Sequence, residues 1–365
     1  MGKISREDAF ILWLMSLEIG DPWRVLQRFG TAEGVFRSGI FGSNRDGLEK
    51  LVRQAEAWLD EGICFISHKN PDFPARLQTM PDKPLGLFVV GDLPDAILPA
   101  VAIVGARDNT HYGRQVARQI AEELAAVGVV VVSGMARGLD AHAHEGALAA
   151  RGLTVAVMPS GVDVCYPAEN FQTYRRVRET GCVVSEFFPG TRPQRWSFPA
   201  RNRIITAMAD VLVVVEAGER SGTSTTVSHA LAQGKEVFAV PGRIFDKKSA
   251  GTNQLIKQGA HILTTYLDVL LALKEQRHLA GFFDVATKAS SGRLCVAEEK
   301  LTQNFNPPLA TDEALVYDCL SYDAVTVDYI AYKTGLDIAG LNKMLLDMEL
   351  AGRIKKLPGQ KYIRN

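Results

Sequence analysis

Short apolar runs alternate with amphipathic stretches through the middle of the chain. The runs are rich in valine and isoleucine and predict β-strands, whereas the stretches between them have the spacing of helices. We expect strands at residues 86–90, 101–104, 129–132, 154–158, 182–185, 211–215, 236–240 and 261–263, and helices at 112–127, 139–150, 171–179 and 223–233. Strands this apolar are covered on both faces. The region therefore predicts a Rossmann-like, doubly wound and mostly parallel α/β sheet, with the first of these strands at its edge.

The two ends of the chain have shorter helical patterns. An N-terminal module is predicted to hold helices at residues 9–17, 23–29 and 48–59. The C-terminal residues predict three helices, at 313–320, 327–333 and 338–350, and then a hairpin, which is the winged-helix plan. We therefore expect a helical module at 1–65, the α/β domain at 66–274, a linker at 275–310 and a winged-helix domain at 311–365.

Composition places the protein among ordinary globular chains. Of its 365 residues 47% are hydrophobic and 22% charged, and 41 lysines and arginines balance 41 aspartates and glutamates. A net charge of zero gives no indication that the protein binds nucleic acid. One local basic patch is nevertheless enough for phosphate binding. The five cysteines are scattered without a C-x-x-C pair, which is typical of reduced proteins. Without a bilayer-length apolar run or a secretory signal, we expect a cytoplasmic protein with no membrane contact.

Arg107 stands where a dinucleotide-binding protein carries its second glycine. The strand at 101–104 runs into Gly105, which permits a sharp turn. The next strand ends in Ser133 and Gly134 instead of the acidic residue that would hold a ribose. Both departures point away from NAD and toward a larger anion that is held partly by side-chain charge.

Small residues, hydroxyls and arginines follow the carboxyl ends of several predicted strands. These ends meet at one edge of a parallel sheet, where such folds bind ligands. A predicted helix also opens with serine, glycine and threonine, and a helix start attracts anions. Each glycine or serine taken singly is better explained as a turn or a cap, but the whole set predicts a phosphate-binding rim. The candidate residues are Gly105, Arg107, Ser133, Gly134, Arg201, Asn202, Arg203, Arg220, Ser221, Gly222 and Thr223.

Catalytic groups are harder to find. His142 and His144 lie two residues apart on a predicted helix, so they face different directions and do not form a metal pair. No nucleophile has a base at a recognisable spacing, and no P-loop sequence is present. Glu216 and Glu219 are either acid–base candidates or partners that position Arg220. We expect neither a metal nor another cofactor.

The predicted winged helix lacks the charge of a typical DNA reader. Its third helix carries Lys343 against Asp347 and Glu349. Its basic residues lie in the hairpin instead: Arg353, Lys355, Lys356, Lys361 and Arg364. Protein contact, weak DNA contact and sequence-specific readout all stay open for this domain.

Six ordered motifs resemble those of the DNA-processing protein A family, also called DprA or Smf. They lie at residues 101–107, 133–140, 159–167 with Asn170, 198–205, 220–223 and 237–242. The resemblance implies a SAM-like N-terminal module and a cytoplasmic bacterial protein that binds single-stranded DNA without sequence preference. It implies loading of the RecA recombinase onto that DNA and displacement of single-strand binding protein. Roles in DNA uptake, competence for natural transformation and recombination would follow, without enzymatic turnover.

The resemblance also assigns roles to residues of this chain. It puts the first phosphate at Gly105 and Arg107, the pocket floor at Ser133 and Gly134, and the next phosphate at Arg220, Ser221 and Gly222. The segment Arg201-Asn202-Arg203 would shape the pocket or contact DNA, and a homodimer would form through residues near 252–273. Asp108 departs from the family pattern and would lower the local positive charge.

Two other hypotheses remain open at this point. Rossmann-like nucleotide-processing enzymes of the phosphoribohydrolase type also hold phosphate at a glycine–threonine helix start. They add a catalytic arginine–glutamate pair, which the sequence does not place. An interaction scaffold is the third hypothesis, and it predicts no retention of DNA at low salt.

Overall fold

The computed structural model describes residues 4–17, 19–219, 221–276, 279, 311–320, 324–351 and 353–364. Internal contacts divide the chain into two compact units, Met1–Phe283 and Asp284–Asn365. The predicted linker at 275–310 lies almost wholly outside the described residues. Within the described residues, no helix combines the length and the apolar character needed to cross a membrane.

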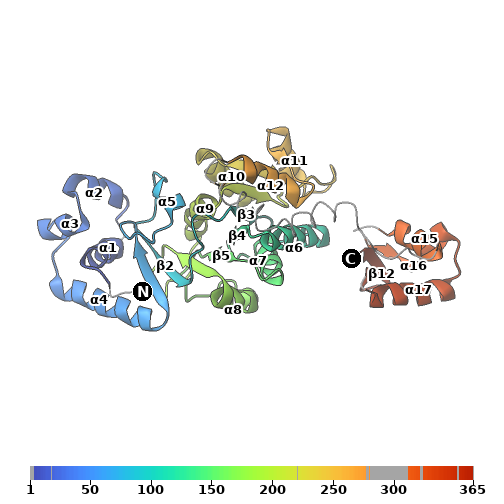
Figure 1. Ribbon diagram of the computed structural model, residues 1–365, viewed down its shortest axis with the longest axis horizontal. Helices are drawn as coiled ribbons and strands as arrows, with labels where there is room; N and C mark the ends of the chain where they lie inside the picture. Colours follow the sequence, from blue (N-terminus) through green and yellow to red (C-terminus); the bar gives the residue numbers. More distant parts are fainter. Residues whose placement is uncertain are drawn as a thin grey trace. The chain divides into compact units, whose positions relative to one another are not determined.

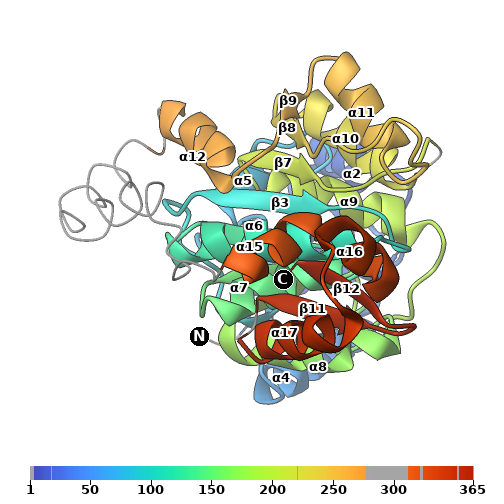
Figure 2. The ribbon, with the colours of Figure 1, turned by 90° about the vertical axis from the view of Figure 1, so that its right-hand side faces the viewer.

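Nine strands of the first unit form one sheet in the order β1-β2-β6-β5-β4-β3-β7-β8-β9. The strands from β6 to β9 along this order are parallel, and Figure 2 shows β3, β7, β8 and β9 in succession toward one edge. Their bounds are β1 Ile63–Ser67, β2 Gly86–Gly91, β3 Ala100–Val104, β4 Val130–Ser133, β5 Thr154–Val157, β6 Cys182–Ser185, β7 Val211–Val214, β8 Glu236–Ala239 and β9 His261–Ile262. The predicted parallel sheet is confirmed.

The predicted edge position of strand 86–90 is wrong. This strand is β2, which pairs antiparallel with β6 on one side and with β1 on the other. The edge strand β1 follows Gly62, whose φ of +78° ends the preceding helix. Its five residues form an apolar run too short to be told from the end of a helix, and they cross the boundary expected at residue 65.

Helices cover both faces of the sheet, as expected for a doubly wound fold. Val101 and Ile103 of β3 pack with α6 and α7, whereas Ala102 and Val104 pack on the other face with α9 and α10. The strand alternates its side chains between two buried faces, which accounts for its continuous apolar sequence. The helices of this part are α5 Ala75–Gln78, α6 His111–Ala126, α7 Leu139–Ala149, η1 Ala168–Asn170, α8 Phe171–Thr180, α9 Ser197–Ala207, α10 Thr223–Ala232, α11 Ala250–Lys257 and α12 Tyr266–Glu275.

Helix α9 was not among the predicted helices, because Pro199 within it is more typical of a loop. Proline normally ends a helix, but Pro199 is the third helical residue, where its missing N–H would have no partner in the helix. The segment before the predicted strand at 211–215, for which the sequence predicted no helix, is therefore a helix.

Four helices group at the β2 end of the sheet, shown in blue in Figure 1. They are α1 Arg6–Ser16, α2 Pro22–Phe29, α3 Ala32–Ser38 and α4 Arg45–Asp60, of which α3 was not predicted. The Phe36 ring of α3 lies 5.3 Å from the Phe10 ring and 4.9 Å from the Trp13 ring, centroid to centroid. These aromatic contacts tie α1 and α3 into one core.

The second unit has the predicted winged-helix plan. Its elements are α15 Thr311–Cys319, β10 Val325–Thr326, α16 Val327–Thr334, α17 Ile338–Leu350, β11 Ile354–Leu357 and β12 Lys361–Arg364. The three strands pair in the order β10-β12-β11, and Leu341 and Leu345 of α17 pack against Ile354 and Tyr362 in its core.

Candidate functional site

A pocket of about 540 Å³ opens at the carboxyl ends of β3 and β7. Chain order reverses between these neighbouring strands, because β4 continues on one side of β3 and β7 begins the other half of the sheet. Such a switch point is where open α/β sheets bind ligands. Seven of the predicted residues line the pocket: Gly105, Arg107, Arg201, Asn202, Ser221, Gly222 and Thr223.

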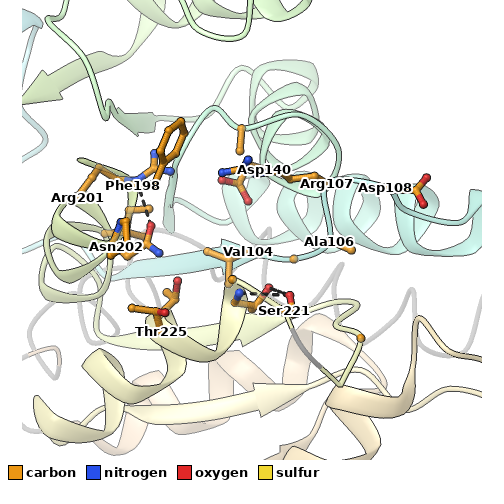
Figure 3. Close-up of a pocket in the computed structure, with 18 of the residues that line it drawn as sticks. Val104, Ala106, Arg107, Asp108, Asp140, Phe198, Arg201, Asn202, Ser221 and Thr225 are labelled. Atoms are coloured by element: carbon orange, nitrogen blue, oxygen red, sulfur yellow. Dashed lines mark hydrogen bonds between the residues drawn. The ribbon is translucent and has the colours of Figure 1, made fainter. Parts of the chain in front are cut away.

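The β3–α6 loop forms one wall and carries Arg107. A Cβ at Gly105 would lie 2.4 Å from the end of the Leu139 side chain and 3.1 Å from the Glu216 carbonyl, so a larger residue would force α7 and this loop apart. The Arg107 side chain is exposed, and its guanidinium lies 4.8 Å from the centroid of the Phe198 ring. This cation–π contact orients the charge without consuming its hydrogen-bond donors. Figure 3 shows Arg107 and Phe198 on one side of the pocket, with Ser221 and Thr225 across from them.

The start of helix α10 forms the facing wall. Ser221, Thr223 and Thr225 bring hydroxyls to the pocket at the positive end of the helix dipole. The Ser221 hydroxyl also bonds within the turn, 2.8 Å from the Thr223 hydroxyl and 3.2 Å from its backbone nitrogen. Ser221 therefore bonds the first residue of α10 and lines the pocket as well. Arg220, predicted to hold a phosphate here, lies outside the described residues.

Arg201 faces inward instead of presenting its charge to the pocket. Only 3% of the residue is exposed, and its Nη1 donates to the carbonyls of Gly134 and Val157. Burial lowers the pKa of Arg201 to about 10, and nearby Asp140 opposes that shift. Burial likewise raises the pKa of Asp140, and Arg201 opposes the rise. The two opposite charges are thus buried near each other, and the inward position of Arg201 corrects the expectation of a phosphate-facing guanidinium.

Arg203 lies away from the pocket, which corrects its predicted place on the rim. Its guanidinium pairs with Glu186 and lies 3.5 Å from the Asp82 carboxylate, beside a separate cleft next to the N-terminal helices. Ser133 and Gly134 lie behind the pocket wall: the Ser133 hydroxyl donates to the carbonyl of Ile103 at 2.6 Å. Neither residue lines the floor as expected.

Lys248 is a lining residue that sequence reasoning missed. It belongs to the loop after β8, and its Nζ donates to the Asp108 carbonyl at 2.6 Å and to the Asp108 carboxylate. The hydrogen bond to Lys248 lowers the pKa of Asp108. Asp108 was expected to lower the positive charge of the pocket, but its negative charge is paired with Lys248. Lys248 lies 140 positions away in the sequence and is brought near Asp108 only by the fold.

Glu216 and His144, two other ionisable candidates, have structural partners. Glu216 is buried, and its carboxylate accepts from the Thr110 amide at 3.0 Å and from the Thr110 hydroxyl at the start of α6. It therefore holds Thr110, the N-cap residue of α6, which is neither of its two expected roles. His144 is buried, bonds the Thr154 hydroxyl at 2.7 Å, and has its pKa lowered by burial to about 3. It is a structural histidine, as predicted for at least one of the two.

The hairpin of the winged helix is only partly available for binding. Arg353 lies 3.1 Å from the Glu313 carboxylate, and Arg364 donates to the Tyr317 carbonyl at 2.8 Å. Exposed lysines remain at positions 355, 356 and 361. Leu346 and Leu350 are also exposed on α17. These observations leave protein and DNA contacts both open for this unit.

Fold and site together define a Rossmann-like α/β protein with a switch-point pocket suited to anions and an appended winged helix. A family model described as DNA recombination-mediator protein A matches residues 64–274, and one described as DprA winged helix domain matches residues 302–360. The chain belongs to the DNA processing protein A (DprA/Smf) family.

Relatives support this assignment along most of the chain. Protein Smf of Escherichia coli is 35% identical over 321 residues, 86% of this chain and 81% of that protein. DNA processing protein DprA of Bacillus subtilis is 38% identical over 230 residues, 62% of this chain and 77% of that protein.

Two solved structures of family members resemble the chain. DNA processing protein A of Streptococcus pneumoniae aligns with a TM-score of 0.61 at 31% identity, covering 74% of this chain and 98% of that one. DNA processing protein A of Helicobacter pylori aligns with a TM-score of 0.52 at 31% identity, covering 57% and 95%. The latter structure describes a single-stranded DNA binding mode of that protein.

Proposed function

We propose that this chain binds the phosphates of single-stranded DNA in the switch-point pocket, without sequence preference. The observation that carries the proposal is the exposed Arg107 guanidinium, held over Phe198 and across from the start of α10. Charge, hydroxyls and a helix start suit a phosphodiester, and phosphate contacts carry no sequence information. The single-stranded DNA binding described for the Helicobacter pylori relative supports the same conclusion.

The proposal includes transfer of the bound strand to the RecA recombinase, with displacement of single-strand binding protein. The family description of a recombination mediator supports this step. It also includes a homodimer formed through residues near 252–273. Edge strand β9 and helix α12 support that part, because Ile262 and Leu271 are 53% and 63% exposed there. We propose no enzymatic turnover and no cofactor.

A salt titration of binding tests the role of Arg107. For single strands the slope of log affinity against log salt is about −0.7 for each neutralised phosphate. We expect Arg107→Ala to weaken binding to a labelled oligothymidylate and to flatten this slope by about 0.7. The control is Arg175→Ala on α8, where the arginine is 58% exposed and lies 3.7 Å from Glu179. An unchanged affinity and slope in Arg107→Ala would remove this residue from the site.

A second measurement distinguishes the proposed DNA binding from the hypothesis of a nucleotide-processing enzyme. The protein is incubated with nucleoside monophosphates, and released base is measured by chromatography. Release of base, together with no retention of single-stranded DNA at low salt, would replace the proposal with a nucleotide-processing activity. Preference for single-stranded over duplex DNA without base release is the expected result.

A further inference from the structure

Two large apolar side chains stand in solvent on the loop that brings Lys248 to the pocket. Ile244 is 81% exposed and Phe245 is 93% exposed, the highest value among the large hydrophobic residues described. We call this pair the tip. Side chains this exposed contribute no burial to folding, so core packing does not explain them.

The tip is held by a braced turn. The Asp246 amide donates to the Arg243 carbonyl at 3.0 Å, which places Ile244 and Phe245 at the two central positions of a β-turn. The Asp246 carboxylate then accepts from the Lys248 amide at 2.8 Å. These bonds fix the direction of the tip before any ligand arrives, and such preorganisation lowers the entropic cost of binding.

The base of the loop is tied to both walls of the pocket. Asn253 bonds the amide and the carbonyl of Gly242 at 3.1 and 3.0 Å, and the Gly251 amide donates to the Ala217 carbonyl, next to the α10 wall, at 2.7 Å. Lys248 reaches the Asp108 carboxylate beside Arg107. The tip therefore extends from the same rigid rim that carries the proposed phosphate site.

We propose that the tip contacts the face of an unpaired nucleobase next to the pocket and thereby favours single-stranded over double-stranded DNA. This inference rests on the proposed function. A strand whose phosphates lie in the pocket exposes its bases, and the face of an unpaired base is apolar and stacks on aromatic rings whatever its identity. In a duplex the same faces are covered by neighbouring base pairs. Exposed Lys247 beside the tip suits a polyanion.

The test compares three ligands with the full-length protein by fluorescence anisotropy: an oligothymidylate, an abasic strand of equal length, and a duplex. The variants are Ile244→Ser with Phe245→Ser, and Phe245→Trp, which keeps an aromatic face. The control is Leu350→Ser on α17, where the leucine is 78% exposed. Because neither tip side chain is packed, the double variant should unfold in urea at the same midpoint as the wild type.

We expect the double variant to bind the oligothymidylate about 5- to 150-fold more weakly, which is the usual effect of losing one stacked base. Its affinity for the abasic strand should equal that of the wild type, and Phe245→Trp should retain binding. Its salt slope should also be unchanged, because stacking neutralises no phosphate.

Three results would overturn the inference while leaving the proposed function standing. One is equal affinity of the wild type and the double variant for the oligothymidylate. Another is an equal loss on the abasic strand. The third is loss of self-association, measured by light scattering, with unchanged DNA binding, which would assign the tip to a second copy of the chain. Failure of the wild type to bind any single strand would instead refute the proposed function itself.

Discussion

Replacing Arg201 by methionine tests whether this residue is structural. The variant keeps the volume of the side chain but leaves Asp140, itself only 6% exposed, without its buried counter-charge. The carbonyls of Gly134 and Val157 lose their donor in the same step. Leaving a buried charge without its compensating charge costs about 3–5 kcal/mol, so we expect Arg201→Met to lower the free energy of unfolding by about that amount.

The double variant Arg201→Met with Asp140→Asn separates the loss of the pair from the loss of packing. Asp140→Asn alone leaves a buried guanidinium without its partner, whereas the double variant buries no charge. We expect the double variant to be more stable than the sum of the two single losses predicts, by about 1–3 kcal/mol.

Urea unfolding followed by tryptophan fluorescence measures these differences in the free energy of unfolding for the first unit alone. The four tryptophans of the chain lie at positions 13, 23, 58 and 196, all within the first unit. DNA titration supplies the second readout: a structural Arg201 leaves the salt slope of the folded variant unchanged. Wild-type stability in Arg201→Met, or a slope flattened by about 0.7, would return this guanidinium to the phosphate site.

Three further predictions concern residues around the pocket. Gly134→Ala places a methyl group 2.3 Å from the Nη1 of Arg201 and should lower the unfolding free energy in urea by about 1–3 kcal/mol. His144 stays neutral in the fold down to about pH 3, so only the unfolded chain gains its proton below about pH 6.5. Stability should thus fall by about 2 kcal/mol from about pH 7 to about pH 5, and His144→Asn should remove this part of the fall. Arg203→Ala should leave DNA affinity unchanged in anisotropy titrations while costing about 1–3 kcal/mol of stability, because Glu186 loses its partner.

The central sheet could be predicted because each of its strands is indicated by a short run of neighbouring residues. The strands β3 to β7 are buried runs rich in β-branched residues with both faces covered, and their alternation with helices along the chain specifies parallel pairing. Gly105, Arg107 and Ser221 could be assigned to one edge for the same reason, since the carboxyl ends of parallel strands meet there.

The directions of the two arginine side chains of α9 could not be predicted from the sequence. Arg201 and Arg203 are two positions apart, and two helical steps of about 100° send their side chains to nearly opposite sides. In a loop both could have faced the pocket, and Pro199 made the segment resemble a loop. Lys248 and Asp108 meet only through the adjacency of β8, β7 and β3, a tertiary fact that no local pattern contains.

The corrected site also changes the expected mode of binding to long strands. Of the four arginines predicted at the rim, Arg107 is the one that the described residues place at the pocket with an exposed side chain. Arg201 lines the pocket but is buried, and Lys248 is already paired to Asp108. One pocket then neutralises about one to two phosphates, which gives a salt slope between about −0.7 and −1.4 for each chain. Modest binding per pocket becomes strong when two linked pockets hold one strand, because the second contact is intramolecular. We therefore expect a steep gain in affinity once an oligothymidylate is long enough to bridge both pockets of the proposed dimer, with a doubled salt slope. Equal slopes for short and long strands would contradict this bivalent binding.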